Sequence, residues 1–231
     1  CVIADWLKKN KPASQVNVLD ANSDIVVERD NFWHAFTVTH AGYVDYQPGC
    51  KITDVDSQSR AISYDQGTTS GISLTAGVLN PIPPQRAPKL LVDAGLVNSP
   101  DGRFTMIDVL SYQSTAASNI HVIGDASHTT MPKAGHIGNQ QAKTCADAIL
   151  RLLQGQTPDQ TPVTNSACYT PITASTATWL SAVYQYDQAS KKMVIPTQHN
   201  QGKALAALAA STENYQDMLI WFDTLMGDTF A

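Results

Sequence analysis

The chain has 231 residues, 43% of them hydrophobic and 15% charged, with a formal net charge of −5. These values are typical of a soluble globular protein with one large domain or two smaller ones. The acidic balance, without a basic stripe, argues against a nucleic-acid-binding surface, and no apolar run approaches the roughly 18 residues that a membrane span needs.

Four cysteines stand at positions 1, 50, 145 and 168. They show neither C-x-x-C spacing nor a paired histidine, so they predict no metal site. The lack of a C-x-x-C-H motif also excludes a c-type haem attached to this chain. Three full disulfide connectivities stay open. Cys145 falls on the apolar face of a predicted helix and is expected to be a small core residue.

The first residues predict a helix followed by a strand. Residues 1–9 carry apolar positions at helical spacing and are followed by a proline that stops the helix. Residues 15–19 predict a short strand that ends at Asp20. This order is that of the second half of a βαβ unit, whose first strand and glycine turn would lie before Cys1.

A weaker helical pattern covers residues 31–40, and short alternating strands follow over residues 43–74. The strands predict a small antiparallel meander, either an insertion or a subdomain. The prolines of PIPPQRAP, residues 81–88, then impose an extended path that fits an inter-domain crossover. Residues 89–94 predict a helix, and a strand-like piece begins at Ile107.

The most informative stretch is IHVIGDAS, residues 120–127. Its β-branched residues predict a strand that ends at Gly124 and places Asp125 at the carboxyl end, where open α/β sheets bind ligands. A helix after Gly135 would point free N–H groups at an anion, and Asp125 would accept hydrogen bonds from ligand hydroxyls. The structural alternative is a buried strand that ends in a turn.

The helix after Gly135 carries an apolar stripe and ends before Gly155. The stripe consists of Ala142, Cys145, Ala148, Ile149, Leu152 and Leu153. Residues 155–167 are rich in Gly, Thr and Pro and predict a linker to a C-terminal block. That block contains a predicted strand at 178–186 and a mainly acidic amphipathic helix at about 204–226, which packs on this chain or on a partner chain.

Five segments together carry a resemblance to a known family. NIHVIGDAS at 119–127, followed by MPKAG at 131–135, is similar to the second FAD-binding motif of two-dinucleotide-domain flavoprotein reductases. Further matches are KKNKPASQVNVLDAN near the start, NPIPPQRAPKLLVDAGL at 80–96, CYTPITASTATWLSAVY at 168–184 and WFDTLMGDTF at the end. Almost the whole chain thus resembles the flavoprotein subunit of flavocytochrome c sulfide dehydrogenase.

The resemblance implies an α/β fold, a partial two-dinucleotide-binding-domain flavoprotein with Rossmann-like FAD/NAD(P)-binding parts and a small α+β C-terminal domain. The expected divisions are a partial nicotinamide-like domain at 1–79, the returning FAD-binding half at 80–160, and a flavin-capping, cytochrome-facing domain at 161–231. The family's G-x-G-x-x-G segment, its first redox cysteine and a nearby catalytic acid are expected before Cys1. Residues 1–231 are therefore not expected to hold FAD tightly or to turn over alone.

The implied function is a periplasmic FAD-dependent sulfide dehydrogenase. It would pass electrons from sulfide, through a redox disulfide and FAD, to a c-type cytochrome subunit that carries the haem. The resemblance assigns Cys168 to the redox disulfide, as the catalytic residue, and Asp125 to the ribityl or pyrophosphate part of FAD. The other residues expected at the cofactor are Gly124, Lys133, Ala134, Gly135, Gln85, Arg86 and Trp221.

Other readings stay open from the sequence. The chain is alternatively a relative of sulfide:quinone or pyridine-nucleotide reductases, although its acidic final helix disfavours an anionic membrane surface. A third alternative is a catalytically inactive chain that binds a cytochrome or forms an assembly. Cys168 is alternatively a structural half-cystine paired with Cys50, and Trp221 a core aromatic. His128 and His136 flank the expected cofactor turn and receive no role.

Overall fold

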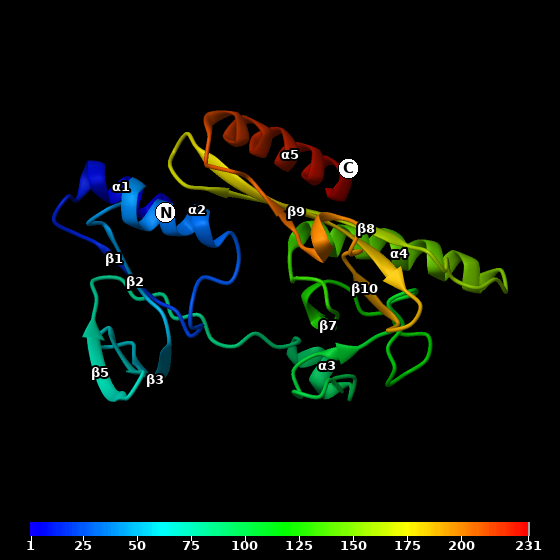
Figure 1. The fold of residues 1–231 in the computed structure, drawn as a ribbon. Helices are drawn as coiled ribbons and strands as arrows, with labels where there is room; N and C mark the ends of the chain where they lie inside the picture. The colour runs from blue at the N-terminus through cyan, green and yellow to red at the C-terminus, as the bar shows by residue number, and fades with distance from the viewer. Residues whose placement is uncertain (231) are drawn as a thin grey trace. The chain divides into compact units, whose positions relative to one another are not determined.

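The computed structural model describes residues 1–230, which form two compact units. Unit 1 consists of residues 1–83, 169–178 and 207–219, and unit 2 of residues 84–168, 179–206 and the chain from 220 onward. The element order along the chain can be followed by colour in Figure 1. The three-domain division expected from the sequence stays a prediction.

Unit 1 begins with the predicted helix and strand, now α1 (Val2–Asn10) and β1 (Val16–Leu19). Ala4 and Leu7 form the buried side of α1. Strand β1 pairs in parallel with β2 (Val44–Gln47). The prediction that the antiparallel meander already begins at residue 43 is therefore wrong. Parallel strands need a crossover connection, and the helical residues between β1 and β2 supply it.

The crossover is α2 (Arg29–His34), which continues into the π-helix η1 (Ala35–Thr39), so the helix expected near residues 31–40 is confirmed. Its aromatic side packs against β2. The Phe36 ring lies 6.0 Å from that of Phe32 and 5.6 Å from that of Tyr46, measured between centroids. A chain of aromatic contacts therefore fixes the crossover on the parallel pair.

The meander itself is confirmed as β3 (Cys50–Asp56), β4 (Ala61–Gln66) and β5 (Thr69–Thr75), which pair antiparallel in this order. Figure 1 shows these strands next to β1 and β2. Ile62 and Tyr64 are buried on the central strand, and the Tyr64 hydroxyl donates a hydrogen bond to Gln47 Oε1 at 3.1 Å. One face of the small sheet thus packs on β2.

Later segments of the chain are tied into unit 1 by buried polar contacts. The Asn31 side-chain amide donates to Thr178 Oγ1, and the Thr178 hydroxyl donates to Glu28 Oε2. His40 is fully buried and its Nε2 lies 2.8 Å from the carbonyl oxygen of Ile172. Because buried polar groups need partners, these bonds fix residues 169–178 in one arrangement.

Unit 2 starts with residues 84–88, which form no regular secondary structure, and with α3 (Lys89–Asp93), the helix expected at 89–94. The strand-like piece expected to begin at Ile107 lies earlier, as β6 (Thr105–Met106), which pairs in parallel with β7 (Ser127–His128), and Ile107 makes only an isolated bridge with Ser114. The strand expected at residues 120–124 is absent from the described chain. His121 makes only an isolated bridge with Gln113. Side chains of high β-propensity do not form a strand without a ladder of backbone partners.

The helix expected after Gly135 is confirmed as α4 (Gly135–Leu153). Its C-terminus is a Schellman motif, in which the Gly155 N–H donates to Leu152 O and the Gln156 N–H to Arg151 O. Gly155 has φ +71°, the left-handed conformation that glycine adopts at no steric cost.

The predicted stripe of α4 is only partly buried. Its buried residues are Ile137, Gln141, Cys145 and Ala148. Leu152 and Leu153 are exposed, Leu153 at 80%, so the prediction for the last turn is wrong. The buried residues of α4 are spaced three or four positions apart and the last of them is Ala148, so the final turn extends past the edge of the core.

A four-stranded sheet belongs mostly to unit 2. It contains β8 (Val163–Pro171), β9 (Ala177–Asp187), β10 (Lys192–Val194) and β11 (Leu205–Ala206), with β8, β10 and β11 all pairing with β9. The strand expected at 178–186 is confirmed, but the linker is shorter than predicted because β8 begins at Val163. The last helix, α5 (Thr212–Phe230), begins later than predicted because residues 205–206 pair with β9.

The core of unit 2 lies between α4, the loops around β6 and β7, and this sheet. Its buried members are Ile107, Val109, Tyr112, Val122, Met131, Ile137, Cys145, Ala182, Tyr184 and Met193. The short 3₁₀ helix η2 (Gly124–Ala126) precedes β7 at the edge of this core. The residues of the expected ligand site therefore stand on a packed support.

Candidate functional site

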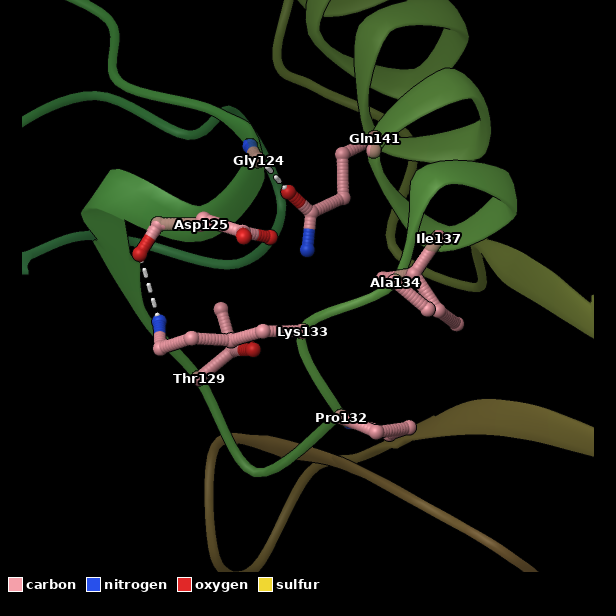
Figure 2. A pocket seen from close by; sticks show the side chains of 9 residues that line it. Gly124, Asp125, Thr129, Pro132, Lys133, Ala134, Ile137 and Gln141 are labelled. Carbon is pink, nitrogen blue, oxygen red and sulfur yellow. Dashed lines mark hydrogen bonds between the residues drawn. The ribbon is translucent and has the colours of Figure 1, made fainter. Parts of the chain in front are cut away.

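A shallow hollow lies where η2, the loop after β7 and the first turns of α4 meet, all within unit 2. It is lined by Gly124, Asp125, Thr129, Pro132, Lys133, Ala134, Ile137, Gly138 and Gln141. Figure 2 shows Asp125 and Lys133 on the loop side and Gln141 on the helix side. Four residues expected at the cofactor, Gly124, Asp125, Lys133 and Ala134, therefore line one surface.

Gly124 is held against α4 by a hydrogen bond that sequence reasoning missed. Its N–H donates to Oε1 of Gln141 at 2.6 Å, and its carbonyl accepts the Ser127 hydroxyl at 2.8 Å. A Cβ at Gly138 would stand 3.7 Å from the Gly124 Cα, an ordinary contact distance that shows how closely the two backbones approach. Gly124 itself has φ +66°, which favours glycine at the turn.

Asp125 presents its carboxylate on the surface of the hollow. Its residue is exposed, and among the described residues none donates a hydrogen bond to the carboxylate. Only its backbone carbonyl is engaged, by Lys133 Nζ at 2.7 Å (Figure 2). An ionised carboxylate has several acceptor positions, so Asp125 can receive hydroxyl or N–H donors from a ligand.

Lys133 folds back over the turn. Its ammonium also donates to Ser127 O at 2.8 Å and lies 3.9 Å from the centroid of the Phe104 ring. Desolvation lowers the pKa of Lys133, and the nearby Asp125 acts in the opposite direction. The side chain thus links the end of η2 to the loop before α4, and the cation–π contact with Phe104 stabilises this position.

The N-terminus of α4 faces the same region. Ala134 is its N-cap residue and makes no side-chain capping bond, so the first-turn N–H groups of Gly135, His136 and Ile137 have no intrahelical partner. These groups and the positive end of the helix dipole favour an anionic or partially negative ligand group.

Two other predicted residues, Cys168 on β8 and Trp221 on α5, are linked to the first turn of α4. Cys168 lies on β8, directly after Ala167, whose N–H donates to Nδ1 of His136 at 3.1 Å. The His136 ring packs edge-on against Trp221 of α5, with centroids 6.1 Å apart. Cys168 and Trp221 are thereby connected through His136, which the sequence analysis left without a role.

Gln85 and Arg86 do not line the hollow. Both are exposed, and the Gln85 carbonyl accepts a hydrogen bond from Arg103 Nη1 at 3.2 Å. Their expected role near the flavin stays a prediction.

The cysteines differ in their surroundings. Cys50 is a buried thiol outside any disulfide, so the structure does not contain the alternative Cys50–Cys168 pair. Cys145 is buried in the core as expected. Burial raises the pKa of both the Cys50 and the Cys145 thiol, which keeps them protonated and unreactive. Cys168 is only half-buried and is the better candidate for chemistry.

The described residues contain neither a cluster of three or more His, Cys, Asp or Glu suited to a metal ion nor a helix long and apolar enough to cross a bilayer.

Comparison with solved structures shows the fold. A chain in the cryo-EM structure of the Tetrahymena thermophila mitochondrial ATP synthase tetramer has a TM-score of 0.60 at 19% identity, over 79% of this chain and 45% of that chain. The HOCl-induced flavoprotein disulfide reductase RclA from Escherichia coli has a TM-score of 0.52 at 13% identity, over 94% of this chain and 52% of that one. The chain thus spans about half the length of these structures.

The expected α/β, Rossmann-like fold class is confirmed by this likeness. Comparison with family models adds a closer relation. Residues 1–83 match the family described as the sulfide dehydrogenase (flavocytochrome c) flavoprotein chain, central part. Over these residues, about a third of the chain, the sequence is similar to the flavoprotein chains of flavocytochrome c sulfide dehydrogenases, and this match confirms the resemblance identified in the sequence for that part.

Proposed function

We propose that this chain is part of a FAD-dependent sulfide dehydrogenase that passes electrons from sulfide to a c-type cytochrome subunit in the periplasm. The observation that carries the proposal is the convergence at the first turn of α4. Asp125, Lys133 and the uncapped helix N-terminus lie on the hollow, and His136 of the same turn connects to the Cys168 strand and to Trp221. The family match of residues 1–83 supports the same function.

The residues present fit the returning half of a FAD site. The exposed Asp125 carboxylate would accept hydrogen bonds from hydroxyl or N–H groups of FAD. The first-turn N–H groups of α4 would supply positive partial charge that stabilises negative charge on the bound flavin without reorganisation. When bound, the flavin accepts an electron pair and releases it as single electrons to a cytochrome. The G-x-G-x-x-G segment that binds the pyrophosphate in such sites is not among residues 1–231.

Cys168 is the reacting residue of this chain. It forms a disulfide with a second cysteine outside residues 1–231, and hydrosulfide attacks that disulfide. One S–S bond breaks and another forms, so one cysteine becomes a persulfide and the other leaves as a thiolate that carries the electron pair. The half-buried position of Cys168 on β8 leaves it accessible to a small anion.

In this proposal, α5 forms the surface that meets the electron acceptor. Trp221 is half-buried beside His136, while Phe222, Met226 and Phe230, which share one face of α5 by their four-residue spacing, expose 51%, 38% and 76% of their surface. An exposed apolar patch beside the cofactor side of the molecule suits the close approach of a haem-bearing partner.

The test uses the FAD-binding protein that contains this chain. Sulfide should bleach the flavin, and Cys168→Ser should reduce the bleaching rate to that of a sulfide-free control, because the attacked disulfide cannot form. Cys1→Ser is the matched control and should bleach at the unmodified rate. Equal bleaching in Cys168→Ser would contradict the role of Cys168.

The acceptor is tested in the same protein. After reduction by sulfide, reoxidation by cytochrome c but not by a soluble quinone is the expected result. Reoxidation by the quinone alone would favour the sulfide:quinone reductase alternative, and no bleaching by sulfide in the unmodified protein would favour a non-catalytic chain.

A further inference from the structure

His136 lies at a junction of three elements of unit 2. It stands in the first turn of α4, its Nδ1 accepts the Ala167 N–H of β8 at 3.1 Å, and its ring packs edge-on against Trp221 of α5. Ala167 immediately precedes Cys168, so the bond fixes the backbone at the point from which the Cys168 side chain departs. One side chain therefore sets the position of two residues that the proposed function uses.

The hydrogen bond determines the protonation state of the ring. A neutral histidine has one N–H and one acceptor nitrogen. Since Ala167 donates to Nδ1, the ring proton is on Nε2. In the imidazolium form both nitrogens carry hydrogen, so Nδ1 would face the Ala167 N–H as a second donor and the bond would be lost.

The charges around the ring come from α4 and α5. Lys143 of α4 disfavours a second positive charge on His136, and Asp228 of α5 favours it. These two are themselves paired, with Lys143 Nζ 2.7 Å from Asp228 Oδ2. Burial is the larger effect and lowers the pKa of His136. Because the unfolded chain binds the proton more readily, stability is retained above the ordinary histidine pKa of about 6.5 and falls as the pH falls below it.

We propose that His136 is a positioning residue whose neutral ring holds the Cys168 strand at the first turn of α4 while packing against Trp221, and that protonation of the ring releases the Cys168 strand. The inference rests on the proposed function only for the importance of Cys168 and Trp221. The contacts of His136 themselves are independent of it.

The test measures hydrogen exchange at the Ala167 amide in the full chain, corrected for the intrinsic pH dependence of exchange. Protection should fall as the pH is lowered from about 8 to about 5, across the titration of the imidazole.

Two variants separate the hydrogen bond from the ring. His136→Asn keeps an acceptor near the position of Nδ1 and should retain Ala167 protection without the pH dependence. His136→Phe keeps a ring beside Trp221 but removes the acceptor, and should lose protection by about tenfold at neutral pH. His128→Phe, at an exposed position on β7, is the matched control and should behave as the unmodified chain.

Unchanged Ala167 protection in His136→Phe, or pH-independent protection in the unmodified chain, would overturn the proposal. If His136→Phe does not fold, the pH titration of the unmodified chain carries the test alone. Failure of the proposed function appears elsewhere: sulfide would bleach the flavin equally in Cys168→Ser, while the exchange at Ala167 would still follow His136.

Discussion

Two helices of 19 residues bring the candidate site together, and they are held in different ways. Helix α4 buries Ile137, Gln141, Cys145 and Ala148, whereas none of the described residues of α5 is fully buried. α4 ends in a complete Schellman motif and packs on the core of unit 2. The second half of α5 meets unit 2 through particular side chains: Trp221 on His136, and Asp228 with Lys143 and Asn139.

The two helices therefore have different roles: α4 supports the candidate site, and α5 covers it. The residues proposed to hold FAD stand on or against α4, where burial of apolar side chains opposes any displacement. The aromatic proposed to face the electron acceptor stands on α5, whose contacts are few and partly exposed. Segments with few buried contacts open at lower free energy than core helices. We therefore expect the second half of α5 to loosen from α4 without unfolding it.

The largest expected effect is from truncation of the α4 core. Ile137 is 1% exposed, and Ile137→Ala should lower the free energy of unfolding by about 2–5 kcal/mol. The matched change on α5 is Ile220→Ala, at a residue 65% exposed, which should change it by no more than about 0.5 kcal/mol. Urea unfolding followed by circular dichroism measures both. Similar losses for the two variants would break the distinction between the helices.

A smaller effect is expected from Gln141, the polar residue on the buried side of α4. Gln141→Ala removes the acceptor of the Gly124 N–H, which is partly buried, so we expect a loss of about 1 kcal/mol, the lower end of the cost of an unsatisfied buried donor. Gln140→Ala is the control, since its side-chain amide donates only to the neighbouring Asn139. In urea unfolding, Gln141→Ala should lose more stability than Gln140→Ala. A loss in Gln140→Ala as large as that in Gln141→Ala would show that Gly124 is not held by this bond.

The same contrast explains which elements the sequence predicts. Helix α4 was predictable because its apolar spacing and Gly155 are local signals that agree with its packing. The beginning of α5 was not, because the residues after 204 have helical composition but pair with β9 instead. The stretch at 120–124 has the composition of a strand, yet only His121 finds a bridge partner. In both places the backbone pairing with another segment, or its lack, determines the secondary structure.

The residues of the candidate site also divide into those that the sequence predicts and those that it does not. The sequence motif predicted Gly124, Asp125, Lys133 and Ala134, and they do line one hollow. Gln141 could have been found, since it follows Ile137 and precedes Cys145 by four residues on the buried stripe, where a polar side chain needs a specific partner. His136 could not, because its partners on β8 and α5 are more than 30 residues and more than 80 residues away in the chain.

The smallest expected effect is at the polar end of α5. Hydrogen bonds, first from Lys143 and then from Asn139, hold the pKa of Asp228 below its ordinary value of about 3.9. Its contribution to stability is therefore present above that value and is lost as the pH falls through the lower pKa of the folded state.

Asp228→Asn should speed amide exchange in the second half of α5 while leaving α4 unchanged, and added salt should produce part of the same effect in the unmodified chain. Asp223→Asn, on the same helix and exposed, is the control. Faster exchange in both helices would mean that α4 and α5 open together, and the distinction between support and cover would not hold.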